Sequence, residues 1–127
     1  MNIEAIHPKY AQYLGDESRL TGAAEGIVFP QSAQELAQAL RSAAQSGLRA
    51  TAQGARTGLS GGAVPRGGLI VNLTRMNRIL GIGRNGDGAF LRAEGGATLE
   101  QIEREAAARG LFFPPDPSEK TATVGGM

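Results

Sequence analysis

A glycine-rich segment is the part of this sequence whose residue types could bind a ligand. Six glycines lie in the fifteen residues from Gly54 to Gly68, in the sequence "GARTGLSGGAVPRGG". Glycine costs conformational entropy, so such a density needs a reason. Successive backbone N–H groups in a loop of this kind can converge on an anion, and Arg56, Thr57 and Ser60 add charged and hydroxyl donors. The segment therefore indicates either an anion-binding loop suited to a diphosphate or a mobile surface loop.

Two familiar phosphate-binding motifs do not describe this segment. A P-loop requires G-x-x-x-x-G-K-[ST], and the residues from Gly54 to Gly62 contain no lysine. The dinucleotide-binding fingerprint G-x-G-x-x-G opens a helix, whereas this segment continues through Pro65 into the apolar run "GLIVNL". Any anion bound here is therefore held without the dipole of a following helix.

The elements that must position this loop are predicted on both sides of it. Strands are expected over 26–30, 48–54 and 68–73, and the last is apolar enough to be buried on both faces. A helix over 32–47 begins with a capping box, Ser32 with Glu35, and ends at a glycine. Its apolar face is predicted to contain Leu36, Ala39, Leu40 and Ala43, and the first two strands with this helix form a compact βαβ unit.

The remaining chain predicts a lead-in helix, a hairpin and a second helix. The lead-in helix covers 8–15, with Tyr10, Tyr13 and Leu14 at helical spacing. The hairpin covers 79–96 and turns at "NGDG", whose residues tolerate positive φ. The second helix covers 98–110, with a Thr98 and Gln101 capping box and an inward face of Leu99, Ile102 and Ala106.

The last seventeen residues predict irregular structure, because three prolines occur between 114 and 117. "TATVGGM" at 121–127 is typical of the start of a strand and turn. We therefore expect the chain to be a fragment of a longer protein.

Composition excludes several classes of function. The chain of 127 residues has no cysteine and one histidine, so disulfides, thiolate metal sites and most zinc chemistry are excluded. A formal net charge of +1, without a basic stripe, argues against nucleic acid as a partner. The N-terminus lacks the pattern of a signal peptide, and no apolar run is long enough for a transmembrane segment. We expect a soluble, cytoplasmic protein, and peripheral membrane association of the intact protein stays open.

Two motifs together resemble a known family. "QGARTGLSGGAVPRGGLIVNLTRMNRIL" at 53–80, followed by "FPPDPSEKTATVGGM" at 113–127, is similar to the N-terminal part of the PCMH-type FAD-binding domain. This is the domain of the vanillyl-alcohol oxidase and p-cresol methylhydroxylase type. The resemblance is strongest to the subgroup that holds glycolate oxidase, D-lactate dehydrogenase and D-2-hydroxyglutarate dehydrogenase. Two motifs in the right order make the resemblance more specific than either alone.

The resemblance implies which residues bind FAD. In the family, the first motif holds the FAD diphosphate and the second segment completes the site. One departure is Ala52, where these proteins often have proline before the loop. Carried over to this chain, the cofactor-binding residues are Gln53, Gly54, Ala55, Arg56, Thr57, Gly58, Leu59, Ser60, Gly61, Pro115, Asp116, Thr123, Gly125 and Gly126.

The resemblance also implies a fold class and an activity. The fold is α+β, the N-terminal lobe of the PCMH-type domain, with a βαβ unit, a small mixed sheet and two main helices. Residues 1–25 are expected to form a helical lead-in, and residues 26–127 the truncated FAD-binding domain. The intact enzyme oxidises a 2-hydroxy acid such as glycolate or D-lactate, and its missing C-terminal part supplies the substrate-binding and catalytic groups. FAD is expected to be noncovalent, because the chain has no cysteine and no histidine near the loop, and the chain alone is expected to be inactive.

Some alternatives stay open at this point. The chain could be a noncatalytic, flavin-free interaction module that self-associates through exposed strand edges. Arg56 is either a diphosphate contact or a solvated loop residue, and Asp116 is by default a turn residue. His7 is interpreted as a surface residue, because no nucleophile accompanies it. The charged residues of the second helix (Glu100, Glu103, Arg104, Glu105) form a solvated face, and Leu73, Met76 and Ile79 are expected in the core.

Overall fold

A four-stranded mixed sheet is the centre of the computed structural model, which describes residues 2–127. The strands are β1 (Glu4–Ala5), β2 (Gly26–Val28), β3 (Ala50–Gln53) and β4 (Leu69–Asn72), in the order β1-β2-β4-β3. β4 runs parallel to both β2 and β3, whereas β1 is antiparallel to β2. The α+β fold with a mixed sheet is confirmed. The predicted βαβ unit is present, because α1 (Ala33–Gln45) connects the parallel strands β2 and β3, and β4 is inserted between these two strands in the sheet.

The sheet is covered on both faces, which explains the continuous apolar sequence of β4. Val28, Leu69 and Val71 pack against α1. Ile27 and Ile70, whose side chains point the other way, pack against the short 3-10 helix η1 (Pro8–Leu14). All four residues of β4 are buried, as predicted.

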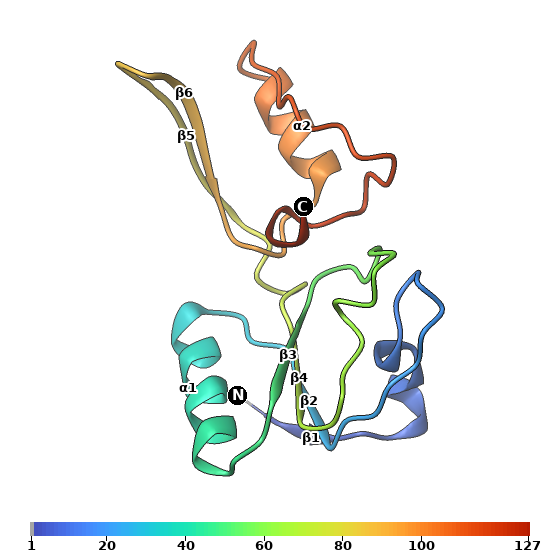
Figure 1. The fold of residues 1–127 in the computed structure, drawn as a ribbon. Coiled ribbons are helices and arrows are strands. Elements are labelled where there is room, and N and C mark those ends of the chain that lie inside the picture. Colours follow the sequence, from blue (N-terminus) through green and yellow to red (C-terminus); the bar gives the residue numbers. More distant parts are fainter. Residues whose placement is uncertain (1) are drawn as a thin grey trace.

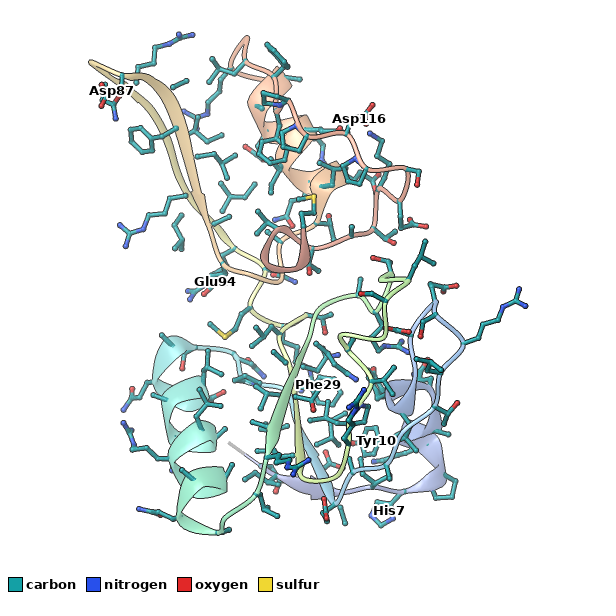
Figure 2. All side chains as sticks on the ribbon, viewed as in Figure 1. His7, Tyr10, Phe29, Asp87, Glu94 and Asp116 are labelled. Carbon is teal, nitrogen blue, oxygen red and sulfur yellow. The ribbon has the colours of Figure 1, made fainter. Side chains whose placement is uncertain are left out.

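An aromatic cluster joins η1 to the sheet. The cluster consists of Tyr10 and Tyr13 of η1 and Phe29 after β2, with ring centroids 5.3 to 6.2 Å apart. Figure 2 shows Tyr10 and Phe29 between η1 and the sheet. The predicted lead-in helix is therefore present, as a 3-10 helix, and β1 before it pairs with β2 in the same sheet.

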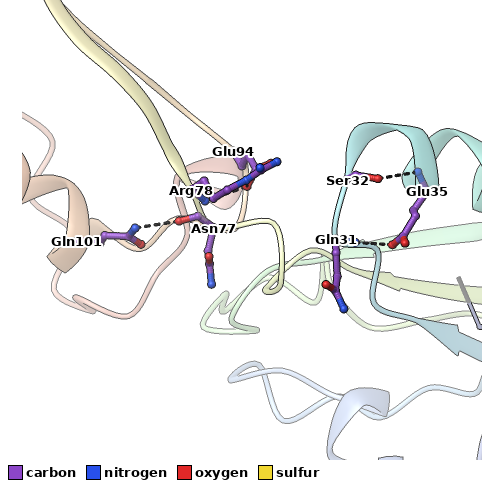
Figure 3. A network of polar contacts seen from close by, with 7 residues as sticks. All are labelled: Gln31, Ser32, Glu35, Asn77, Arg78, Glu94 and Gln101. Atoms are coloured by element: carbon purple, nitrogen blue, oxygen red, sulfur yellow. Dashed lines mark hydrogen bonds and ion pairs between the residues drawn. The ribbon is translucent and has the colours of Figure 1, made fainter.

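The ends of α1 are set by its sequence. The Ser32 Oγ accepts a hydrogen bond from Glu35 N at 3.1 Å, and the Glu35 carboxylate accepts one from Gln31 N at 2.8 Å (Figure 3). At the other end, Gly47 takes φ 65°, and its N–H donates to the Ala44 carbonyl, closing the last turn. Ala39 and Ala43 are buried and Leu36 is half-buried, but the prediction for Leu40 was wrong, because 44% of its surface is exposed at the edge of the apolar face.

A long hairpin and a second helix form the other half of the molecule, above the sheet in Figure 1. The hairpin consists of β5 (Ile79–Asn85) and β6 (Gly88–Ala93), paired antiparallel as predicted. Of its turn residues only Gly88 has a positive φ, of 125°, and the Asn85 side chain instead accepts a hydrogen bond from Asp87 N.

The second helix, α2 (Leu99–Ala107), buries Leu99, Ile102 and Ala106, as predicted. The Thr98 hydroxyl accepts from Gln101 N at 3.2 Å. The Gln101 side chain does not complete the predicted capping box, because it donates to the Asn77 carbonyl at 2.8 Å and so ties α2 to the base of the hairpin (Figure 3).

The C-terminal residues follow α2 as an extended segment. Of the strand start and turn predicted at 121–127, only the turn is present, because Thr123 makes an isolated bridge to Thr98 and the backbone then turns into the 3-10 helix η2 (Val124–Gly126). The Val124 N–H donates to the Ala97 carbonyl at 2.8 Å and Gly125 N to Gly95 O at 2.9 Å, which anchors η2 on the segment before α2. Among residues 2–127, no helix has the length and apolar character needed to cross a membrane.

Candidate functional site

A cavity of about 340 Å³ lies where the glycine-rich loop meets the C-terminal turn η2. In Figure 1 the loop leaves the upper end of β3 in green, and η2 is the dark red turn above it. The loop and η2 were both predicted to bind the cofactor, and although they are far apart in sequence they line the same cavity. The lining residues are Ala52, Gln53, Gly54, Ala55, Arg56, Thr57, Gly58, Ser60, Gly62, Ala63, Leu73, Gly95, Ala122, Thr123, Gly125 and Gly126.

Four of the predicted residues do not line this cavity. Leu59 is 80% exposed on the outside of the loop, and Gly61 faces Leu20 and Ser18 of the N-terminal segment. Pro115 and Asp116 are exposed on the segment that follows α2. The structure therefore brings together the loop and the last residues, and leaves the proline-rich stretch apart from them.

The loop offers unpaired backbone donors. None of the seven N–H groups from Gly54 to Ser60 donates a hydrogen bond to another residue of the described chain, 2–127. Thr57 and Ser60, which carry hydroxyl groups, line the same cavity. Because a concave run of free N–H groups carries partial positive charge, this surface fits an anion.

Gln53 holds the two ends of the loop together. Its side chain is 2% exposed, and its amide nitrogen donates to the Ala63 carbonyl at 2.8 Å and to the Tyr13 carbonyl at 2.6 Å. Its amide oxygen accepts from the buried Asn72 of β4 at 3.2 Å. Both polar atoms of the Gln53 side chain are thus hydrogen-bonded within the protein. Gln53 borders the cavity only because it lies at the end of β3.

Gly54 and Thr123, which both line the cavity, lie in close contact. A Cβ atom at Gly54 would overlap the Thr123 side chain, which is 4% exposed. Glycine is therefore required at this position by close packing, since its φ is not in the left-handed region. This contact joins the loop to the C-terminal turn.

Arg56 has a backbone conformation that is unusual for a non-glycine residue. Its φ is 60°, in the left-handed region, which costs about 1 kcal/mol for a non-glycine residue. Its guanidinium group lies 4.7 Å from the centroid of the Tyr13 ring and donates a hydrogen bond to the Gln12 carbonyl. The side chain rests on η1, although Arg56 also lines the cavity, and its contact with a diphosphate stays a prediction.

Asp16 lies behind the loop. Its Oδ1 accepts a hydrogen bond from Ser18 N at 2.8 Å, and its carboxylate is 3.9 Å from the position of a Cβ at Gly58. The Ser18 hydroxyl, followed by the backbone N–H groups of Ser18, Ala63 and Gly61, holds the pKa of Asp16 below its ordinary value.

Asp116 makes an ion pair with Lys120, which also pairs with Glu103 of α2 at 2.9 Å. Hydrogen bonding to Asp116 and then to Glu103 raises the pKa of Lys120. Figure 2 shows Asp116 and His7 at opposite ends of the molecule, both on the outside. Within 2–127, no group of three or more acidic or histidine side chains is arranged to hold a metal ion.

Several lining residues were not predicted from the sequence. They are Ala52 in β3, Gly62 and Ala63 at the far end of the loop, Leu73 after β4, Gly95 before α2, and Ala122. For Gly95 the available signal was its pairing with Gly96, since two adjacent glycines close to a helix start indicate close backbone packing. Met76 is buried as expected, whereas Leu73 and Ile79 are half-buried.

Comparisons with known proteins identify the family of most of the chain. Residues 24–127 match the family model described as FAD binding domain. The chain is 40% identical to D-lactate dehydrogenase of Anaerostipes hadrus over 87% of its own length and 24% of that protein. It is 34% identical to glycolate oxidase subunit GlcD of Bacillus subtilis (strain 168), over 80% of the chain and 22% of that protein.

A solved structure shares the fold at low sequence identity. The structure of 6-hydroxy-D-nicotine oxidase from Arthrobacter nicotinovorans superposes with a TM-score of 0.77 at 21% identity, covering 97% of this chain and 27% of that one. The chain therefore spans about a quarter of the length of the proteins that it matches.

Proposed function

Because the chain belongs to the FAD binding domain family, we propose that its glycine-rich loop and C-terminal turn form one wall of an FAD diphosphate site. The loop from Gly54 to Ser60 supplies backbone N–H groups, and Thr57 and Ser60 supply hydroxyl donors. Thr123, Gly125 and Gly126 form the opposite side of the cavity. Leu59, Gly61, Pro115 and Asp116 stay candidates from the family resemblance alone.

One observation carries the proposal. Two segments far apart in sequence converge on one cavity, and the loop that lines it has backbone N–H groups without a partner among the described residues. Paired glycines and a close approach at Gly54 keep side chains out of this space. A diphosphate requires this combination of free donors and close backbone approach.

The substrate part of the proposal is a 2-hydroxy acid such as glycolate or D-lactate. It rests on the similarity to a protein named D-lactate dehydrogenase and to one named glycolate oxidase subunit GlcD. Bound FAD supplies the hydride acceptor for oxidation of such an acid. The residues of this chain bind and orient the cofactor, and the residues that line the cavity include no carboxylate, histidine, lysine, cysteine or tyrosine. We therefore propose that the 127 residues have no turnover on their own, and that a longer protein supplies the substrate site.

Noncovalent binding is part of the same proposal. The chain has no cysteine, and its one histidine, His7, is exposed at the end of the molecule remote from the C-terminal segment (Figure 2). Flavin bound to the protein should therefore leave it completely on denaturation in guanidinium and filtration. Flavin that stays with the polypeptide would contradict this.

Gly58→Val tests the loop assignment. The nearest atom to a Cβ at Gly58 is the Asp16 carboxylate at 3.9 Å, so the folded chain accepts the substitution, while the β-branched side chain stiffens and crowds the loop. We expect the variant to lose at least tenfold in FAD affinity with an unchanged circular dichroism spectrum. The measurement is flavin fluorescence during titration, with thermal stabilisation at saturating FAD as a second readout.

Gly86→Val is the matched control, because Gly86 lies at the hairpin tip with no atom within 4 Å of its Cβ position. The control should bind FAD like the parent chain. If saturating FAD neither binds nor stabilises the parent chain, the flavin-free interaction module is the better description. That alternative has support in the hairpin, where Leu80 and Phe90 are about half exposed, at 52% and 49%.

A further inference from the structure

We propose that Arg56 is a positioning residue that braces the glycine-rich loop from behind, against η1, instead of contacting the diphosphate. This inference rests on the proposed function of the loop. It assigns a role to the cationic side chain that stands in the middle of the loop, and to the N-terminal residues on which it rests.

The direction of the Arg56 side chain is the first observation. Its guanidinium group lies over the Tyr13 ring, 4.7 Å from the centroid, and donates to the Gln12 carbonyl. A guanidinium over an aromatic face is held by cation–π attraction, and a carbonyl oxygen satisfies part of its donor set. The cation is therefore engaged on the side of the loop that faces η1.

The backbone of Arg56, like its side chain, is held against the N-terminal segment. With φ at 60°, the residue adopts a conformation that glycine adopts without penalty, in a segment where glycine is abundant. Its carbonyl accepts a hydrogen bond from Glu17 N at 3.2 Å. The strained conformation thus places both the carbonyl and the side chain of Arg56 against the same N-terminal segment.

Gln53 makes a parallel connection three residues earlier. Its amide donates to the Tyr13 carbonyl, so Gln53 and Arg56 both hold the loop against residues 12–17. Between them they fix the part of the loop whose N–H groups are free. Preorganised donors bind an anion more tightly than mobile ones, because less conformational entropy is lost on binding.

A consequence concerns the N-terminal segment. The matched family region begins at residue 24, yet the brace is formed by residues before it. Residues 12–17 therefore belong functionally to the FAD-binding unit.

The first experiment compares Arg56→Gln with Arg75→Gln in this chain. Arg75 lies over the Phe29 ring at the same 4.7 Å distance and is not part of the cavity, so it controls for losing an arginine–aromatic contact. We expect Arg56→Gln to raise the dissociation constant for FAD about tenfold, and Arg75→Gln to leave it unchanged. The melting temperatures of both variants without FAD should stay close to that of the parent chain.

A double-mutant cycle separates a brace from a direct diphosphate contact. Tyr13→Leu removes the ring and should weaken FAD binding as Arg56→Gln does, with no further loss in the double variant. The conservative Tyr13→Phe keeps the ring and should retain affinity. If Arg56→Gln weakens binding while Tyr13→Leu does not, Arg56 contacts the ligand and the brace is wrong.

Limited proteolysis tests the brace without any flavin. Chymotrypsin can cleave after Leu59, which is 80% exposed in the loop, and after Phe112, which is 82% exposed elsewhere. A loosened loop predicts faster cleavage at Leu59 in Arg56→Gln, with unchanged cleavage at Phe112 as the internal reference. Equal cleavage rates at Leu59 in Arg56→Gln and Arg75→Gln would overturn the inference. Failure of the parent chain to bind FAD would instead refute the proposed function, and the proteolysis result would still decide on the brace.

Discussion

Individual residues of the site divide into those that line the cavity and those that support the loop. Gly54 lines it and permits the approach of Thr123, whereas the Gln53 side chain is buried and holds the loop closed. Both residues stand in one motif, and the sequence does not distinguish their roles. Only the packing shows that one provides space and the other provides hydrogen bonds.

Gly54→Ala should destabilise the chain by about 1 to 3 kcal/mol, because the added methyl group overlaps the Thr123 side chain. Thr123→Ala removes the overlapping hydroxyl and methyl groups. The double variant should therefore be more stable than the sum of the single effects predicts, by about 1 kcal/mol. Urea unfolding of the four proteins measures this coupling, and strictly additive effects would show that the two residues are not in contact.

At the scale of elements, the ends of the two α-helices agree with the residues predicted to cap and end them. Their predicted apolar faces agree less well. Ser32 and Thr98 cap them, and Gly47 and Gly110 end them with φ of 65° and 68°. Leu40 departs from the predicted apolar face of α1. A helix presents a stripe to the sheet, and a residue at the edge of that stripe is covered only if a neighbouring element reaches it.

Leu40→Ala and Leu36→Ala form a matched pair on α1. Leu36 packs against the buried cluster of Val28, Leu69 and Val71, whereas Leu40 is 44% exposed. We expect Leu36→Ala to cost about 1 to 2 kcal/mol in the free energy of unfolding, and Leu40→Ala less than about 0.5 kcal/mol. Thermal or urea unfolding gives both values, and equal losses would place Leu40 in the core.

At the scale of the whole molecule, the cavity lies at the junction of its two halves. The loop and β3 come from the sheet half, and Gly95 and η2 come from the half that contains the hairpin and α2 (Figure 1). Polar contacts also close the base of the hairpin, where its two strands begin and end. Arg78 donates to the Glu94 carboxylate through its side chain at 2.7 and 3.1 Å and through its backbone N–H at 2.9 Å (Figure 3).

The contact between Arg78 and Glu94 should make the stability of the fold depend on pH. The Arg78 side chain, followed by its backbone N–H, lowers the pKa of Glu94 in the folded chain. A carboxyl group with a lowered folded pKa stabilises the fold above its unfolded pKa, near 4.3, and this contribution is lost as pH falls through the folded pKa. Glu94→Gln should therefore melt at a lower temperature than the parent chain at pH 7, and the difference should disappear toward pH 2.

Glu105→Gln is the control, because Glu105 is exposed on α2 and makes no ion pair with any of residues 2–127. Its melting temperature should follow that of the parent chain at every pH. A Glu94→Gln difference that stays constant from pH 7 to 2 would show that the carboxylate charge is not responsible.

The sequence by itself determined the main helices and their caps, the hairpin, the central strand and the family. Hydrophobic period, caps and glycines are local signals, and they predicted both α-helices, the hairpin, the buried strand β4 and the glycine-rich loop. The order of the two motifs identified the FAD-binding domain, which the family match confirms. These features depend on neighbouring residues, so one sequence is enough to find them.

Only the tertiary structure decided which residues meet. The insertion of β4 between β2 and β3, the meeting of Gly54 with Thr123, and the position of Arg56 on Tyr13 all join residues that are distant in sequence. Such contacts arise from sheet order and packing, which a motif does not encode. The same physical reason explains why the proline-rich stretch, adjacent in sequence to the C-terminal turn, lies outside the cavity while η2 lines it.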